Sequence, residues 1–232
     1  MPQGHQDSGL THKPTSWYVS FKETDYMAPR QSPAKEKLID AAVKVVREKG
    51  YNATSVDDLC REAGVTKGAF FHHFPTKADL GIAAAEAWKL HANDLFGNAP
   101  FMAQDDPLDR ILGYLDYRRD MLDGPIGAFT CLVGTMVQES YDTLPALREA
   151  CQESIWGHAR TLVDDIEAAR KRHGVAGDWT AESLALHTQA VLQGAFILAK
   201  AADDPQAARD TADHLIRYVR MLFNLSPEKG NP

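Results

Sequence analysis

The segment REAGVTKGAFFHHFPTKADL, residues 61–80, joins the end of one predicted helix to the starts of two others. Gly64 ends the first helix, because glycine readily adopts the left-handed conformation that closes a helix. A short second helix is expected over residues 66–73, and Thr76 stands where the N-cap of a third is expected. Together with the amphipathic run at residues 53–63, this spacing predicts a helix-turn-helix.

The same pattern of helix and break continues in both directions. Upstream, Ser32-Pro33 predicts an N-cap and a first turn, apolar residues then recur at helical spacing, and Gly50 ends the helix. No run of Val, Ile and Thr alternates long enough to form a sheet. The sequence therefore predicts an all-α protein of about nine helices. Downstream of the helix-turn-helix, the expected helices span residues 76–96, 107–122, 127–140, 145–172, 180–202 and 206–224.

Charge is distributed unevenly along a chain whose net charge is −7. Residues 30–80 carry nine Lys and Arg against seven Asp and Glu, whereas residues 81–232 carry fourteen against twenty-two. The first segment is therefore mildly basic, at +2, and the second is acidic, at −8. An acidic total argues against indiscriminate nucleic-acid binding, but a basic segment permits local binding.

Several classes of protein are disfavoured by composition. No apolar run approaches the length of a membrane span, and the N-terminus lacks the pattern of a secretory signal. Three cysteines are too few for a disulfide framework, so a cytoplasmic protein is expected. Met27 lies six residues before the first predicted helix, which leaves two alternatives open for residues 1–26: a genuine tail or an early start-codon assignment.

The second helix of the predicted helix-turn-helix has the side chains that a DNA major groove requires. Val65 and Phe70 are expected to anchor it in the core, which turns the remaining residues outward. Lys67 can reach guanine acceptors or a phosphate, and Ala69 can meet a thymine methyl group. Lys77 lies at the flank where phosphates would pass, beside the N–H groups of a helix start. The residues expected to face outward are Thr66, Lys67, Ala69, His72 and His73.

Residues 33–80 resemble the TetR family of transcriptional regulators. The match lies in KLIDAAVKVVREKGYNATSVDDLCREAG followed by VTKGAFFHHFPTKADL, and its most specific part is the string G-V-T-K-G-x-x-x-x-H-F-x-x-K. The family commonly has tyrosine where this chain has Phe71, which cannot donate a hydrogen bond, so His72 is expected to take over part of that contact. The resemblance implies DNA contacts by Thr54 or Ser55, Thr66, Lys67, Gly68, Ala69, Phe71, His72, His73 and Lys77.

Taken singly, each of these residues also has a simpler interpretation. Lys67 and Lys77 fit ordinary solvated lysines, and Phe71 fits a core residue; their joint occurrence at this spacing favours DNA binding. Adjacent histidines diverge by about 100° around a helix and cannot easily share an ion, so His72 and His73 predict no metal site. No cofactor is expected.

The acidic segment contains most of the aromatic residues, and long helices of this kind can enclose a small-molecule cavity. Cys131 lies in TCLVGTMVQE, which resembles a G-C-L-[LV]-G-N segment of one TetR branch, some of whose members respond to electrophiles or oxidants. A sensor thiol and a buried, inert cysteine are both open. Each other candidate also fits a packed core. The candidates for the cavity are Trp88, Phe96, Tyr117, Met121, Phe129, Cys131, Met136, Trp156 and Gln193.

The last two predicted helices carry more apolar surface than one bundle needs. SLALHTQAVLQGAFILAKA, residues 183–201, is apolar on more than one face, and a second stripe follows at residues 215–223. The resemblance implies a homodimer through a four-helix interface; the alternative is that both stripes belong to the monomer core. The candidates for the interface are Gln189, Phe196, Leu215, Tyr218, Val219 and Leu222.

These observations divide the chain into a tail at residues 1–31, a helix-turn-helix domain at 32–78, a ligand-binding and dimerisation domain at 79–225 and a tail at 226–232. The expected function is a regulator, by resemblance a repressor, released from a palindromic operator by a small molecule. The alternatives are a helical carrier or an enzyme without DNA binding. An enzyme is disfavoured because the chain has no HExxH, GxSxG or glycine-rich phosphate motif, so no catalytic residue is expected.

Overall fold

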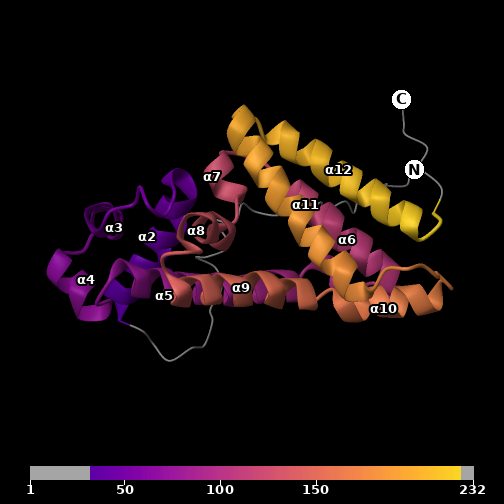
Figure 1. Cartoon of the computed structure of the whole chain (residues 1–232), viewed down its shortest axis with the longest axis horizontal. Coiled ribbons are helices and arrows are strands. Elements are labelled where there is room, and N and C mark those ends of the chain that lie inside the picture. Colours follow the sequence, from indigo (N-terminus) through magenta and orange to yellow (C-terminus); the bar gives the residue numbers. More distant parts are fainter. Residues whose placement is uncertain (1–31, 226–232) are drawn as a thin grey trace, which may run out of the picture.

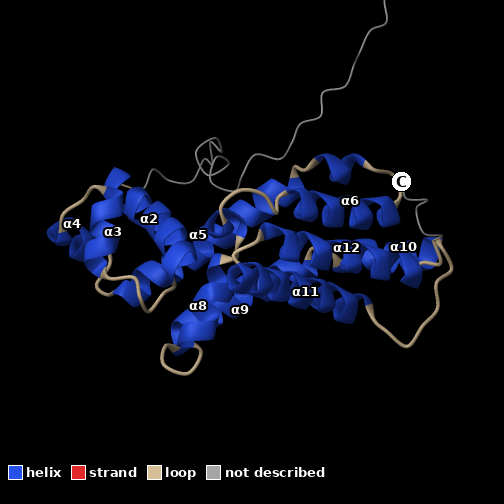
Figure 2. Cartoon of the chain, turned by 90° about the horizontal axis from the view of Figure 1, so that it is seen from above, coloured by secondary structure: helices blue, strands red, loops and turns tan. Residues whose placement is uncertain are grey.

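A computed structural model describes residues 32–225 as helices joined by short connections (Figure 1). No strand occurs in that range, and the second view contains only helices and loops (Figure 2), which confirms the all-α prediction. The two predicted tails lie outside the described residues. The elements are α2 (Pro33–Lys49), α3 (Val56–Ala63), α4 (Lys67–His73), α5 (Lys77–Gly97), the 3₁₀ helix η1 (Pro100–Ala103), α6 (Pro107–Asp120), α7 (Ile126–Phe129), α8 (Leu132–Ser140), α9 (Pro145–Arg160), α10 (Val163–Arg172), α11 (Ala181–Ala202) and α12 (Pro205–Leu222).

The first helices begin and end at the residues that the sequence marks. Ser32 caps α2 by accepting a hydrogen bond from the Lys35 amide at 3.3 Å. Ser55 and Thr76 each form a reciprocal capping box with the aspartate three residues later. Gly64 closes α3 in the left-handed region, with φ of 64°. These local interactions explain why the helix boundaries in this part could be predicted closely.

Helices α2, α3 and α4 form a compact unit at one end of the molecule (Figure 1). Its centre is made by Leu38, Leu59 and Phe70, one from each helix, and all three are fully buried. Because Phe70 holds the inner side of α4, its other side is directed to solvent. The helix-turn-helix prediction is confirmed.

The remaining helices form a longer body that α5 connects to this unit. α5 contacts α2 near its start and then runs alongside α9, while α6 packs on α10 and α12, and α11 packs on α12 (Figure 1). α7 and α8 are wedged between the body and α2. The predicted domain boundary at 78/79 falls inside α5, which is continuous across it, so that boundary stays a prediction.

Two predicted helices are interrupted. The expected helix 127–140 breaks at Thr130 and Cys131, which are both extended, because the guanidinium of Arg47 takes the carbonyls of Ala128 and Thr130 at 3.1 and 3.4 Å. The expected helix 145–172 breaks at residues 161–162, where the hydroxyl of Thr161 donates to the His158 carbonyl at 2.8 Å. Neither break contains Gly or Pro, the residues by which helix ends are usually recognised in a sequence.

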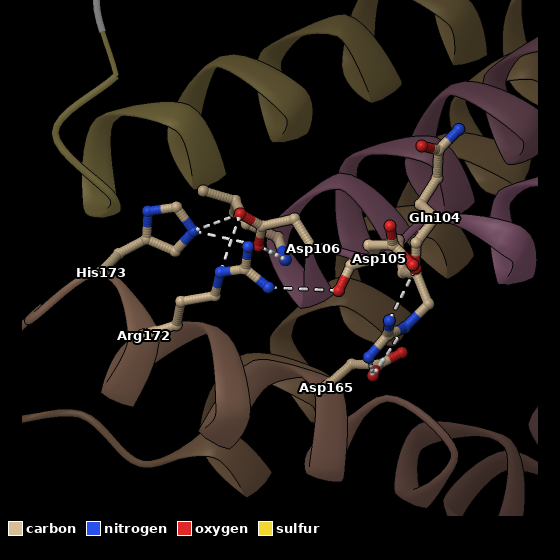
Figure 3. Close-up of polar contacts among 8 residues, drawn as sticks. Gln104, Asp105, Asp106, Asp165, Arg172 and His173 are labelled. Carbon is tan, nitrogen blue, oxygen red and sulfur yellow. Dashed lines mark hydrogen bonds and ion pairs between the residues drawn. The ribbon is translucent and has the colours of Figure 1, made fainter.

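Ion pairs join α10 to the start of α6 at the end of the body farthest from α4 (Figures 1 and 3). Arg110 Nε donates to Asp165 Oδ1 at 2.9 Å, and Arg172 donates to the Asp105 carbonyl at 3.2 Å. His173 Nε2 lies 3.0 Å from both carboxylate oxygens of Asp106, and this contact holds the pKa of Asp106 below its usual value. These contacts fix the far end of the bundle.

Candidate nucleic-acid interface and ligand cavity

The outward face of α4 makes few contacts with the rest of the protein. Thr66, Lys67, Gly68, Phe71 and His72 are exposed. Phe71 stands against the ring of Phe70, and a Cβ at Gly68 would meet only the Thr66 hydroxyl, at 3.7 Å. Ala69 and His73 are partly buried beside this face. Gly68 and Ala69 therefore leave this part of the helix surface without large side chains. Close approach of a helix to base edges requires such a surface.

Lys67 is held in an ion pair across the helix-turn-helix. Its Nζ lies 2.7 Å from Oδ1 of Asp57 on α3, with both side chains well exposed. Hydrogen bonding to Asp57 raises the pKa of Lys67, so the ammonium stays charged at neutral pH. Asp57 binds one side of the ammonium, so a phosphate or a guanine would have to share Lys67 with this carboxylate or displace it.

The two N-cap hydroxyls differ in what they can offer to DNA. Ser55 Oγ accepts from the Asp58 amide at 3.1 Å and donates to Asp58 Oδ2 at 2.7 Å, so its hydrogen is already used. Thr66 Oγ1 accepts from the Ala69 amide at 3.1 Å, which leaves its hydroxyl hydrogen able to donate. Thr66 also stands at the N-terminus of α4, where backbone N–H groups attract anions.

Three predicted DNA-contact residues have partners within the protein. Thr54 is 1% exposed and donates to the Gly50 carbonyl at 2.6 Å, so its assignment as a DNA contact is wrong. Lys77 Nζ donates to the carbonyls of Tyr51 and Thr54 at 2.9 and 3.0 Å, and burial lowers its pKa. Two of its three hydrogens are thereby used, and a phosphate contact by the third stays a prediction. His73 Nε2 lies 2.9 Å from the hydroxyl of the α2 cap.

A small cavity of about 30 Å³ lies in the body between α5, α6, α9 and α11. Four predicted residues line it: Trp88, Phe129, Cys131 and Gln193. Phe96, Tyr117, Met121 and Met136 are not among the lining residues and belong to the hydrophobic core, so they pack as core residues. Trp156 is 44% exposed on α9, outside the cavity, and its assignment is wrong.

Polar residues that the sequence analysis missed also line the cavity. These are Arg118, Ser154, His158 and Gln189. His158 is buried, and burial, reinforced by the charge of Arg118, lowers its pKa to about 3, so the imidazole is neutral at pH 7. His158 Nε2 lies 2.9 Å from the hydroxyl of Tyr114, which accepts a hydrogen bond from Gln189 Nε2 at 3.2 Å. An arginine among apolar residues of a predicted helix was the signal that could have found this group.

Cys131 lies at the boundary of two spaces. It lines the cavity and also a second hollow, of about 250 Å³, between α8 and α11. Lys200 lines that hollow and donates to the Thr135 hydroxyl at 3.2 Å, and burial lowers the pKa of its ammonium. Cys60 and Cys151 are buried elsewhere. Cys131 is therefore the most accessible thiol of residues 32–225.

Two contacts connect the cavity wall to the helix-turn-helix. Arg47 of α2 donates to the Ala128 and Thr130 carbonyls, which flank Phe129 in the wall. At the other end of α8, Glu139 accepts a hydrogen bond from the backbone amide of Asn52 at 2.6 Å. Both contacts lie at the C-terminal end of α2 and in the loop that follows it, so a displacement of the α7–α8 segment would move this end of α2.

The outer face of α11 and α12 leaves large apolar side chains in solvent. Ile197, Leu198, Tyr218 and Met221 are all exposed, Met221 at 72%. Of the predicted interface residues, Tyr218 lies on this face, and Leu222 is partly buried. The assignments of Gln189, Phe196, Leu215 and Val219 are corrected, because these side chains are buried within the chain itself.

No helix within residues 32–225 has the length and apolar character needed to cross a membrane. In the same residues, no group of three or more His, Cys, Asp or Glu side chains is placed to hold a metal ion.

Comparisons with known proteins point to the same family in both halves of the chain. A family model described as "Bacterial regulatory proteins, tetR family" matches residues 38–84, and one described as "Tetracyclin repressor-like, C-terminal domain" matches residues 107–215. The chain is 34% identical to transcriptional regulator AcuR of Cereibacter sphaeroides over 48% of its length and to HTH-type transcriptional regulator CymR of Pseudomonas putida over 60%. These matches span 51% and 66% of the two relatives.

Solved structures share the fold over most of the chain. A crystal structure of regulatory protein TetR from Rhodobacter sphaeroides has a TM-score of 0.71 at 26% identity, covering 81% of this chain and 99% of that one. The reduced form of Escherichia coli NemR has a TM-score of 0.64 at 21% identity, covering 80% and 96%, which shows likeness of fold alone.

Proposed function

Because the chain belongs to the TetR family of bacterial regulatory proteins, we propose that it is a cytoplasmic, DNA-binding transcriptional regulator. In this proposal a homodimer binds a palindromic operator in double-stranded DNA, and a small molecule in the body releases it. The relatives named transcriptional regulators support a regulator over an enzyme.

The observation that carries the proposal is the exposed face of α4. Thr66 can donate from a helix N-terminus, Lys67 is charged, and Gly68 leaves the helix surface open to close approach. Phosphate contacts position a protein on DNA and base-edge contacts select the sequence, and this face offers groups for both. The acidic body supports the proposal, since it disfavours DNA contact elsewhere.

The dimer is supported by the exposed apolar face of α11 and α12. Ile197, Leu198, Tyr218 and Met221 would be removed from water by a second copy of the same face, and apolar burial of this kind is the main favourable term in association. Gly194 has open space around its Cβ position, which permits close approach of a partner helix. A two-fold dimer would place two copies of α4 on successive major grooves, roughly 34 Å apart.

Release by an effector follows from the contacts of α7 and α8. A molecule in the cavity would touch Phe129 and Cys131, on either side of the break that Arg47 holds. If the bound molecule favours a different position of this segment, it shifts α2 and changes the spacing of the two α4 helices. DNA affinity then falls by the difference in effector affinity between the two conformations, and by no more.

DNA binding is tested by fluorescence anisotropy with DNA from upstream of the protein's own gene, at two salt concentrations and with random competitor. Lys67→Ala should weaken specific binding roughly tenfold or more, since one good base or phosphate contact is worth about 1–3 kcal/mol. Lys89→Ala is the matched control, because Lys89 pairs with Glu86 on α5 in the body.

Equal affinity of the two variants would contradict the assignment of α4. Failure of the protein to select any DNA, even from a genome-wide pool, would favour the alternative of a helical carrier without DNA binding.

A further inference from the structure

Arg118 is a buried cation for which residues 32–225 provide no counterion. It lies on α6, is 8% exposed, and its guanidinium carbon stands 5.3 Å from the ring centroid of Phe96 and 5.8 Å from that of Phe196. Within residues 32–225 it has ring contacts but neither a hydrogen bond nor an ion pair. Arg119, the next residue, is by contrast paired with Asp213 at 2.9 Å. Burying an unpaired cation is costly, which makes Arg118 a group in need of an anion.

The second donor at the cavity is the imidazole of His158. Gln189 Nε2 donates to the Tyr114 hydroxyl, so the hydroxyl hydrogen is best satisfied by donation to His158 Nε2. A neutral imidazole that accepts at Nε2 carries its hydrogen on Nδ1. His158 Nδ1 is buried and has no hydrogen-bond partner in the described part of the chain. The relay therefore leaves an N–H donor unused at a cavity-lining residue.

The rest of the lining adds no negative charge. None of its residues is Asp or Glu, and Trp88, Phe129 and Phe196 supply aromatic walls. A cationic ligand would be repelled by Arg118, and a neutral one would leave the guanidinium unpaired. A phosphate carries a charge of about −1.5 to −2, which is more than one arginine neutralises. The space is also small, since about 10–15 Å³ on this scale already holds one water.

We propose that the effector is a small carboxylate, bound through its anionic group to the Arg118 guanidinium and the Nδ1 hydrogen of His158, with its apolar part against the aromatic walls. This rests on the proposed function, because it names the chemical class of the molecule that would release the regulator. Carboxylate and guanidinium match in shape as well as charge, since two parallel N–H groups can bind two oxygens.

The test is calorimetric binding to the purified full chain. The probes are acetate, propionate and benzoate, each compared with its neutral amide, which has a similar shape but no charge. At least one acid should bind, and its amide should bind roughly 10–100-fold more weakly, as expected for hydrogen bonds to a charged group. Arg118→Gln should weaken the acid by the same factor, whereas Arg119→Gln, which removes an exposed paired arginine, should not.

Thermal unfolding gives a second, independent readout. Arg118→Met, which removes an unpaired buried charge and keeps the bulk, should unfold at the same or a higher temperature without ligand. The acid that binds should raise the unfolding temperature of the unaltered protein and of Arg119→Gln only. A clear loss of stability in ligand-free Arg118→Met would show that the arginine has a partner within the protein and would overturn the proposal.

The outcomes separate this inference from the proposed function. Amides binding as well as acids, or no binding by any acid, would overturn the carboxylate while leaving specific DNA binding intact. An acid that binds through Arg118 to a protein that selects no DNA would support the carboxylate site and contradict the regulator.

Discussion

Replacing Arg47 with methionine should remove the main polar tie between α2 and the α7–α8 segment. Arg47 is 2% exposed, donates to the carbonyls of Ala128 and Thr130, and stacks over Trp88 at 5.1 Å. Methionine keeps most of the apolar bulk but has no donor. The carbonyls of Ala128 and Thr130 then lose the donor that keeps the chain extended between α7 and α8.

The size of the effect follows from these bonds. A hydrogen bond from a charged group contributes about 1.5–3 kcal/mol, so the two bonds to the segment correspond to about 3–6 kcal/mol. The substitution also removes a third bond, from Arg47 Nε to the Val43 carbonyl within α2, at 3.0 Å. Removing a buried charge offsets part of this loss, because the guanidinium no longer has to be taken out of water. We therefore expect the free energy of unfolding to fall by about 2–4 kcal/mol.

Urea unfolding followed by circular dichroism measures this change. Arg61→Met is the matched control, because Arg61 is exposed and pairs with Asp58 at the surface, where ion pairs contribute little to stability. In a DNA-release assay, Arg47→Met should still bind operator and effector, but the effector should release DNA less effectively. A loss of stability in Arg47→Met no greater than in Arg61→Met would refute the role given to Arg47.

Two further predictions concern pH and thiol chemistry. The folded pKa of His158, about 3, lies below the value of 6.5 expected after unfolding, so the unfolded chain binds an extra proton between these limits and stability falls as pH falls through this window. Between pH 6.5 and 5, His158 should contribute about 2 kcal/mol of this loss, and urea unfolding of His158→Gln should show a correspondingly flatter pH profile. For the thiols, a disulfide reagent such as dithionitrobenzoate should modify one cysteine of the native protein quickly, and Cys131→Ser should abolish that phase, because the other two cysteines are buried. Rapid reaction of Cys131→Ser would contradict the burial of Cys60 and Cys151.

The helix-turn-helix could be predicted closely from the sequence because its boundaries are set by local interactions. The caps of α3 and α5 bond to residues three positions away, and Gly64 needs no distant partner for its left-handed conformation. Thr54 and Ser55 both have side chains that can cap a helix, and the structure shows that Ser55 caps α3 whereas Thr54 is buried.

The body was less predictable because its decisive contacts are distant in sequence. The break at Thr130 depends on Arg47, which lies 83 positions away. Periodicity identifies an apolar helix face but does not show whether that face packs against the same chain or against another. Leu215, a predicted interface residue, is therefore buried within the chain, whereas Met221, which was not predicted, is exposed. Aromatic residues likewise make up only part of the cavity wall, which also contains Arg118.

The ion pair between Lys67 and Asp57 gives the free protein an internal substitute for DNA. The carboxylate binds the ammonium as a phosphate would, so a phosphate that takes the same position must displace an anion belonging to the protein. Such an exposed pair contributes little to stability, and a dimer would break two of them. The ion pair must be broken on every DNA sequence, but only a matching sequence offers base contacts that offset the loss. Asp57 would thus shorten the time that the protein spends bound to unrelated DNA. The carboxylate would thereby help the protein to find its operator sooner.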